Sequence, residues 1–249
     1  TIRVVDRFLA RLRRRGYFLI APNYTTSVLR GLRGPLENTT AALRWVVEHA
    51  GEYGYDPEKI GLYGVSAGGH LSLMAAATME LAGGSFSFCF VESAPTDLIG
   101  LRNGEAFDRS WVMRLFPSST LRRLSPINHV DQSLPPILIF HGTADEMVHL
   151  DQSARYVEAV RRAGGEAELV RWAGGNHAFL NYPDSIWYRQ ETVALEFFDD
   201  GVASSPRSRD SRASVRSRKR PRPTSRASAP LIWAPVNPRN RPKWPGMDD

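Results

Sequence analysis

A Gly-x-Ser-x-Gly pentapeptide, residues 64–68, constrains the fold of this 249-residue chain more than any other feature. It ends a short apolar run and is followed by a run of small, helix-forming residues from Leu71 to Thr78. This context predicts a strand that reverses sharply into a helix, with Ser66 strained at the apex. Because glycine has no Cβ, Gly64 and Gly68 let the backbone pass close to itself. The pattern favours an exposed nucleophilic serine over an incidental serine in a glycine-rich turn.

Two further strand ends carry residue types that can activate a serine. The apolar strand Ile137–Phe140 is followed by a loop that contains Asp145, and a strand near 167–172 is followed by His177. Because the carboxyl ends of parallel strands share one edge of a sheet, we expect the three side chains to meet there. Alone, Asp145 fits a turn aspartate and His177 a loop histidine without a role. Their common edge and their order along the chain favour a catalytic triad.

The three side chains predict nucleophilic acyl transfer. His177 takes the proton of Ser66 during attack on an ester carbonyl, and Asp145 orients the imidazole. The main-chain N–H of Ala67, the residue after the nucleophile, is the expected oxyanion donor. No His, Cys and Asp cluster has the spacing of metal ligands, so we expect neither a metal nor a cofactor.

The chain resembles an alpha/beta-hydrolase of the esterase and lipase type, in particular the hormone-sensitive-lipase-like and feruloyl- or acetylxylan-esterase-like branch. The resemblance covers roughly residues 1–200 and implies an α/β class fold, the alpha/beta-hydrolase fold, with a mostly parallel sheet flanked by helices. It implies a serine carboxylesterase that acts on small or carbohydrate-linked esters through an acyl-enzyme. The motifs that carry it are Asn23-Tyr24, residues 41–46, residues 55–60, Ser125-Pro126-Ile127, residues 141–145 and Gly175-Asn176-His177.

One family motif is missing from the sequence. Esterases of this kind carry a His-Gly-Gly-Gly-type loop that supplies oxyanion-hole amides, and no such motif occurs among these residues. By resemblance, the strand before that loop lies between the strand Phe18–Ala21 and the strand that ends at Ser66. Since an unfilled position leaves backbone groups unpaired, we expect a family member that lacks its first portion and has reduced activity.

Two other functions stay open at this point. Prolyl-oligopeptidase-type peptidases have hydrolase domains that resemble residues 55–180, although the Asn23-Tyr24 region favours an esterase. A catalytically impaired hydrolase scaffold is the other, because the missing loop removes an oxyanion donor. Ester and peptide substrates separate the first two functions, and a serine-directed label separates both from the third.

Three polar residues near the expected site have simpler explanations than catalysis. His70 lies one helical turn after Ser66, where we expect a structural or supporting role. His141 ends a strand at a family turn position, which favours a bond to the backbone. Asp97 is the alternative acid, but capping of a helix explains it as well.

Charge divides the chain into a body and a tail. Residues 201–249 hold 12 Lys and Arg against 3 Asp and Glu, whereas the remainder holds 20 against 23. The stretch Ser204–Arg226 is rich in Ser, Arg and Pro, so we expect a disordered tail after a catalytic domain of residues 1–200. A basic arm could bind nucleic acid or an anionic surface. Because no folded nucleic-acid module accompanies it, we favour a solvated tail and a small-molecule ester as the partner.

Alternating periodicities predict the remaining architecture. Strands are expected near 17–22, 60–65, 86–92, 137–141 and 167–172, and helices near 3–15, 36–51, 67–80, 151–163 and 186–199. The stretch 96–125 is expected to hold loops and a short helix that packs on the sheet or lines a substrate entrance. The single cysteine, Cys89, lies in an apolar run and indicates a buried thiol. No apolar run is long enough to span a membrane and no leader pattern is present, so we expect a cytoplasmic protein.

Overall fold

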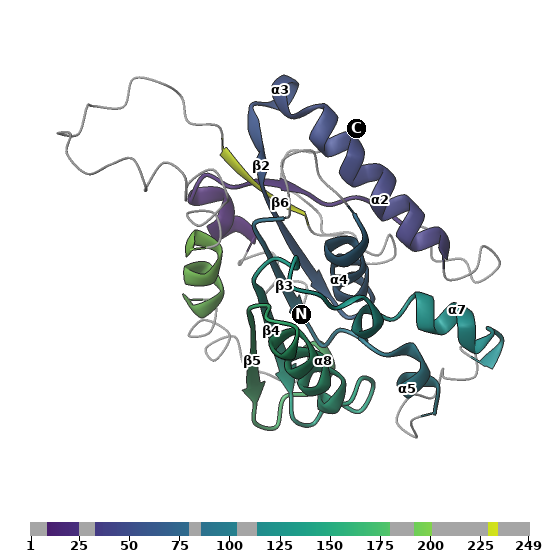
Figure 1. The fold of residues 1–249 in the computed structure, drawn as a ribbon. Coiled ribbons are helices and arrows are strands. Elements are labelled where there is room, and N and C mark those ends of the chain that lie inside the picture. Colours follow the sequence, from purple (N-terminus) through teal and green to yellow (C-terminus); the bar gives the residue numbers. More distant parts are fainter. Residues whose placement is uncertain are drawn as a thin grey trace.

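Six parallel strands form one sheet in the described part of the chain, in the order β1-β6-β2-β3-β4-β5 (Figure 1). The computed structural model describes residues 9–24, 33–79, 86–103, 114–179 and 192–200, and the backbone of 229–233. The parallel sheet confirms the fold class predicted from the alternating periodicities. The strands are β1 (Phe18–Ile20), β2 (Tyr55–Val65), β3 (Phe88–Glu92), β4 (Ile137–Gly142), β5 (Ala167–Trp172) and β6 (Ala229–Trp233).

Helices connect the strands and cover both faces of the sheet. Two of them, over residues 9–14 and 192–200, lie together on one side, and α2, α4 and α8 lie on the other (Figure 1). β2 begins at Tyr55, earlier than expected, because residues before Ile60 also run extended beside β6. The labelled elements are α2 (Arg33–Glu48), α3 (Ala50–Tyr53), α4 (Ala67–Thr78), α5 (Leu98–Asn103), α7 (Ser118–Arg123), α8 (Leu150–Arg162), and the 3₁₀ turns η2 (Pro126–His129) and η3 (His177–Phe179).

The central strands are apolar on both faces because both faces are covered. Successive side chains of a strand point to opposite sides. In β3, Phe90 packs in the cluster with the helices over 9–14 and 192–200, whereas Cys89 packs in the cluster with α2, α4 and α8. This explains why β3 and β4 read as continuous apolar runs rather than alternating ones. Cys89 is fully buried, which confirms the expected buried thiol.

β6 fills the position between β1 and β2 where the resemblance had led us to expect an unfilled gap. Leu231 pairs with Phe18 of β1 on one side and with Ile60 of β2 on the other. The backbone groups of both neighbours therefore have ladder partners, which corrects that expectation. The disorder predicted for the tail does not extend to these five residues. The rest of the tail, 201–228 and 234–249, lies outside the described residues.

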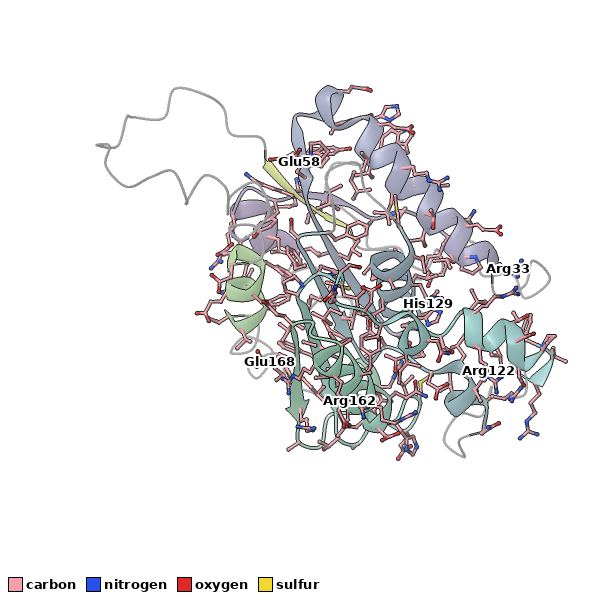
Figure 2. All side chains as sticks on the ribbon, viewed as in Figure 1. Arg33, Glu58, Arg122, His129, Arg162 and Glu168 are labelled. Carbon is pink, nitrogen blue, oxygen red and sulfur yellow. The ribbon has the colours of Figure 1, made fainter. Side chains whose placement is uncertain are left out.

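Several charged side chains lie exposed at the periphery of the molecule. Glu168 and Arg171 are exposed on β5, the edge strand of the sheet, and Arg162 is exposed in the last turn of α8 (Figure 2). Charges on an edge strand discourage pairing with another chain. Within the described ranges no helix has both the length and the apolarity to cross a bilayer.

Candidate active site

The turn between β2 and α4 has the strained geometry that the pentapeptide predicts. Ser66 lies at its apex with φ 54° and ψ −119°, in a region that L-residues rarely adopt. A Cβ on Gly64 would lie 2.3 Å from the carbonyl oxygen of Gly68, so no side chain fits there. The main-chain N–H of Ser66 donates to the carbonyl oxygen of Glu92 at 2.8 Å. The end of β3 therefore holds the apex in place.

The structure brings the three predicted side chains together. The Nε2 of His177 lies 2.9 Å from the Oγ of Ser66, and its Nδ1 lies 2.9 Å from the Oδ2 of Asp145. A carboxylate can only accept, so Nδ1 carries the proton of this bond and the neutral ring has Nε2 free to accept from the serine hydroxyl. The three side chains thus form one hydrogen-bonded chain at the carboxyl edge of the sheet.

Asp145 is buried and strongly hydrogen-bonded. Its Oδ1 accepts from the main-chain N–H of Met147 at 3.0 Å and of Val148 at 2.9 Å. Burial raises the pKa of Asp145, but hydrogen bonds from His141, His177 and Val148 outweigh it and bring the pKa well below its usual range. The carboxylate is therefore charged at neutral pH and can stabilise an imidazolium.

The loop that carries His177 is tied to the end of β3 by a serine that the sequence did not single out. The main-chain N–H of Ala178, which has φ 52°, donates to the Oγ of Ser93 at 3.3 Å. Ser93 is fully buried, has φ 49°, and donates its own N–H to the carbonyl oxygen of Phe140 at 3.0 Å. A serine after a strand has no distinctive pattern, so only the fold reveals this contact.

Ala67 begins α4 directly after Ser66 and is exposed. The N-terminus of a helix presents free N–H groups and the positive end of its dipole. This is the position that the sequence predicts for the oxyanion donor. Within the described ranges, no group of three or more His, Cys, Asp or Glu side chains is arranged to hold a metal ion.

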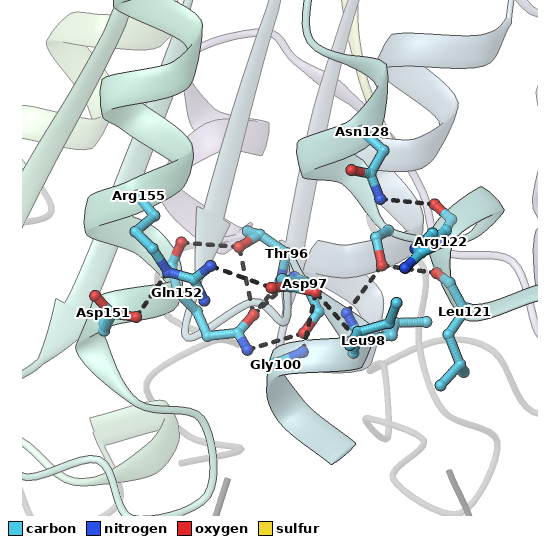
Figure 3. A network of polar contacts seen from close by, with 12 residues as sticks. Thr96, Asp97, Leu98, Gly100, Leu121, Arg122, Asn128, Asp151, Gln152 and Arg155 are labelled. Atoms are coloured by element: carbon cyan, nitrogen blue, oxygen red, sulfur yellow. Dashed lines mark hydrogen bonds and ion pairs between the residues drawn. The ribbon is translucent and has the colours of Figure 1, made fainter. Parts of the chain in front are cut away.

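Asp97, the alternative acid, is engaged elsewhere (Figure 3). Its Oδ1 accepts from the main-chain N–H groups of Ile99 and Gly100, both at 3.0 Å, which caps α5. Its Oδ2 pairs with Arg155 of α8 at 3.1 Å, and Gln152 of α8 accepts from its main-chain N–H at 2.8 Å. The geometry therefore gives Asp97 the capping role and fixes the loop after β3 on α8.

The other predicted polar residues also find partners. The Nδ1 of His70 donates to the carbonyl oxygen of Pro95 at 3.0 Å, and desolvation lowers the pKa of this histidine. In the stretch 96–125, expected to pack on the sheet or to line a substrate entrance, Leu115 is exposed and Phe116 packs beside α5 and α7. Trp111 and Met113, two further apolar residues of this stretch, lie outside the described residues.

A surface hollow of about 530 Å³ lies over the loop after β4. Its lining includes Glu146, His149 and Asp151. Asp145 also borders it, but the carboxylate is fully shielded from solvent and faces His177 instead. Glu146, the residue after Asp145, is exposed.

Comparison with known proteins finds esterases among the relatives of this chain. Residues 2–160 match the model of the BD-FAE family. Esterase LipQ of Mycobacterium tuberculosis is 30% identical over 190 residues, which are 69% of this chain and 45% of LipQ. The chain spans less than half the length of the first curated relatives that it matches, 37% to 45%.

Two solved structures show the same architecture. A truncated form of a carbohydrate esterase from gut microbiota superposes with a TM-score of 0.60 at 25% identity, and the match covers 73% of each chain. Thermogutta terrifontis esterase 2, phosphonylated by sarin, superposes with a TM-score of 0.57 at 29% identity over 69% of this chain and 66% of that one.

Proposed function

The chain belongs to the BD-FAE family and has the fold of an alpha/beta-hydrolase esterase, and we propose that it hydrolyses carboxylic esters. In this proposal Ser66 is the nucleophile, His177 the general base and Asp145 the acid that orients it. The observation that carries the proposal is the continuous chain of hydrogen bonds from the Oγ of Ser66 to the carboxylate of Asp145. The relatives LipQ and Thermogutta terrifontis esterase 2 are esterases by name, which supports the same class.

The reaction proceeds in two halves through an acyl-enzyme. The Nε2 of His177 accepts the hydroxyl proton of Ser66 as its Oγ attacks the ester carbonyl carbon. The imidazolium, held by the charged Asp145, then donates that proton to the leaving alcohol as the ester C–O bond breaks. Water, deprotonated by the same histidine, attacks the acyl-enzyme and releases the carboxylic acid and the free serine.

Negative charge develops on the carbonyl oxygen in both halves. We assign the main-chain N–H of Ala67 as one donor to this oxyanion, because it follows the nucleophile at the start of α4. Loss of one such donor typically costs about 2.7–4 kcal/mol of transition-state stabilisation. The strained φ of Ser66 supports this assignment. It belongs to the sharp turn between β2 and α4, which sets the direction of the peptide group that follows the serine.

The substrate class that we propose is a small ester or an ester on a carbohydrate. The likeness to a carbohydrate esterase favours the second form. A panel of p-nitrophenyl acetate, p-nitrophenyl butyrate, methyl ferulate and acetylated xylo-oligosaccharides tests the acyl and alcohol parts separately. A prolyl p-nitroanilide, which is an amide, tests the peptidase alternative.

The decisive experiment compares two serine variants on p-nitrophenyl acetate. Ser66→Ala should abolish hydrolysis above the buffer background, because only the hydroxyl is lost. Ser119→Ala removes an exposed hydroxyl from α7 and should keep the rate of the parent chain. Equal hydrolysis by Ser66→Ala and by the parent chain would remove Ser66 from the mechanism.

A further inference from the structure

A second histidine contacts the acid of the proposed triad. His141 is the next-to-last residue of β4 and is fully buried. Its Nε2 lies 2.8 Å from the carbonyl oxygen of Val148 and 3.2 Å from the Oδ2 of Asp145. Its Nδ1 lies 2.7 Å from the Oγ of Ser153, a buried residue of α8. The sequence led us to expect only the bond to the backbone.

These contacts fix the tautomer of His141. A carbonyl oxygen has no proton to give, so the Nε2 that faces Val148 must carry one. In the neutral ring Nδ1 is then an acceptor, and the hydroxyl of Ser153 donates to it. Both ring nitrogens are thus held, one by the loop after β4 and one by α8. The ring cannot turn without breaking a buried hydrogen bond, which is costly.

The single Nε2–H of His141 is shared between the carbonyl oxygen of Val148 at 2.8 Å and the Oδ2 of Asp145 at 3.2 Å. The main-chain N–H groups of Met147 and Val148 hold Oδ1, and the Nε2–H of His141 faces Oδ2. With both oxygens fixed, the plane of the carboxylate is fixed as well. That plane determines where the Nδ1–H of His177 can point, and therefore whether its Nε2 faces Ser66.

We propose that His141 is a positioning residue of the esterase reaction, whose Nε2–H holds the carboxylate of Asp145 in the orientation that receives the Nδ1–H of His177. The inference rests on the proposed function. It also rests on a contact that can be tested without activity. His141 acts through Asp145 and His177 and does not touch substrate, so its loss should lower kcat and leave KM nearly unchanged.

A matched pair of substitutions distinguishes the effect of losing the N–H donor from the effect of changing the side-chain volume. His141→Gln keeps an N–H donor near the place of Nε2, whereas His141→Met has a similar volume and no donor. We expect kcat per phosphonate-titrated site to fall about 10- to 100-fold in the Met variant, with KM within about twofold. The Gln variant should stay within about threefold of the parent. Titration of active sites excludes misfolded molecules from the comparison.

Acid unfolding gives a readout that needs no activity. Because the pKa of Asp145 is lowered in the folded state, its contribution to stability is present above its unfolded pKa and is lost as the pH falls. Without the donor of His141 that pKa rises toward its usual value, so His141→Met should lose less stability than His141→Gln between pH 6 and pH 3. Only His141 and His177 among described titratable groups contact this carboxylate. The difference should vanish when both variants also carry Asp145→Asn.

The two readouts distinguish failure of the inference from failure of the proposed function. Equal kcat and equal acid sensitivity in the Gln and Met variants would overturn the role of His141, whatever the parent hydrolyses. If the parent chain hydrolyses no ester, the proposed function fails. In that case the unfolding comparison still decides whether His141 holds Asp145.

Discussion

The hydroxyl of Tyr63 donates a hydrogen bond to the Oε1 of Glu92 at 2.8 Å, in the interior of the sheet. Both residues are almost completely buried, at 2% and 1% exposure. Burial raises the pKa of Glu92 to about 8, and the bond from Tyr63 opposes this rise only in part. The main-chain carbonyl oxygen of Glu92 accepts from the N–H of Ser66, so the residue with this raised carboxyl pKa is hydrogen-bonded through its backbone to the turn between β2 and α4.

This pair predicts a pH dependence of stability. The folded state binds the proton of Glu92 more tightly than the unfolded state, whose pKa is near 4.5. The stabilising contribution is therefore complete below about pH 4.5 and is lost as the pH rises through about 8. Glu92→Gln keeps an acceptor for Tyr63 but cannot ionise. Urea unfolding from pH 5 to pH 9 should show the parent losing stability relative to this variant.

A control substitution on the surface checks this reading. Glu168→Gln, on the exposed face of β5, should follow the pH curve of the parent. If the curves of the parent and of Glu92→Gln run parallel over the whole range, Glu92 has an ordinary pKa and the prediction is wrong.

Gly64 should tolerate no side chain. The Cβ of Gly64→Ala would meet the backbone of Gly68 and Gly69 at 2.3–2.6 Å. Backbone cannot move aside as a flexible side chain can, so we expect a loss of about 3 kcal/mol or more in unfolding free energy. Gly51→Ala is the matched control, because its Cβ would meet nothing within 4 Å in α3. If Gly64→Ala has the same unfolding free energy as Gly51→Ala, the close approach of Gly64 to Gly68 and Gly69 is wrong.

Asp145→Asn should lower kcat by about 10⁴-fold with little change in KM. The N–H groups of Met147 and Val148 retain the amide oxygen at the Oδ1 position. The amide nitrogen then takes the place of Oδ2, facing the Nε2–H of His141 and the Nδ1 of His177. A donor there favours the tautomer of His177 that is protonated on Nε2, which cannot accept the serine proton. Steady-state kinetics showing near-parental kcat would exclude Asp145 as the acid.

A proline substitution tests whether β6 pairs with strands on both sides. β6 has neighbours on both sides, so the N–H of residue 232 points toward a strand whichever way it faces. Ile232→Pro removes that donor and should cost on the order of 1–3 kcal/mol of unfolding free energy. Removal of residues 234–249, which follow the strand, should leave the melting temperature unchanged. Unchanged stability of the proline variant would show that β6 does not pair in solution.

Local patterns were sufficient for five of the six described strands and for the meeting of three polar side chains at one edge of the sheet. Ser66, Asp145 and His177 each follow a strand that the sequence predicts, and strand ends of a parallel sheet share an edge. The residues that hold them have no such signal. Ser93 and His141 owe their roles to the packing of β3, β4 and α8, and the charge state of Glu92 depends on burial by both layers.

β6 is the clearest limit of reading the sequence locally. Leu231, Ile232 and Trp233 form a short apolar spot within a basic, Ser- and Pro-rich stretch, and composition there favours disorder. β6 pairs with β1 and β2, which are more than 160 residues earlier in the chain, and it fits between them only because these two strands leave room for a strand. Non-local pairing of this kind leaves no periodicity to detect.

The position of a covalent adduct shows whether Ser66 is the nucleophile of this site. The parent chain is incubated with a fluorophosphonate, digested and sequenced by mass spectrometry, with Ser66→Ala treated in parallel. We expect one adduct, on the Ser66 peptide of the parent and absent from the variant, because among the described residues only this hydroxyl is bonded to the Nε2 of His177. No adduct on the parent, or an adduct that persists in Ser66→Ala, would contradict it.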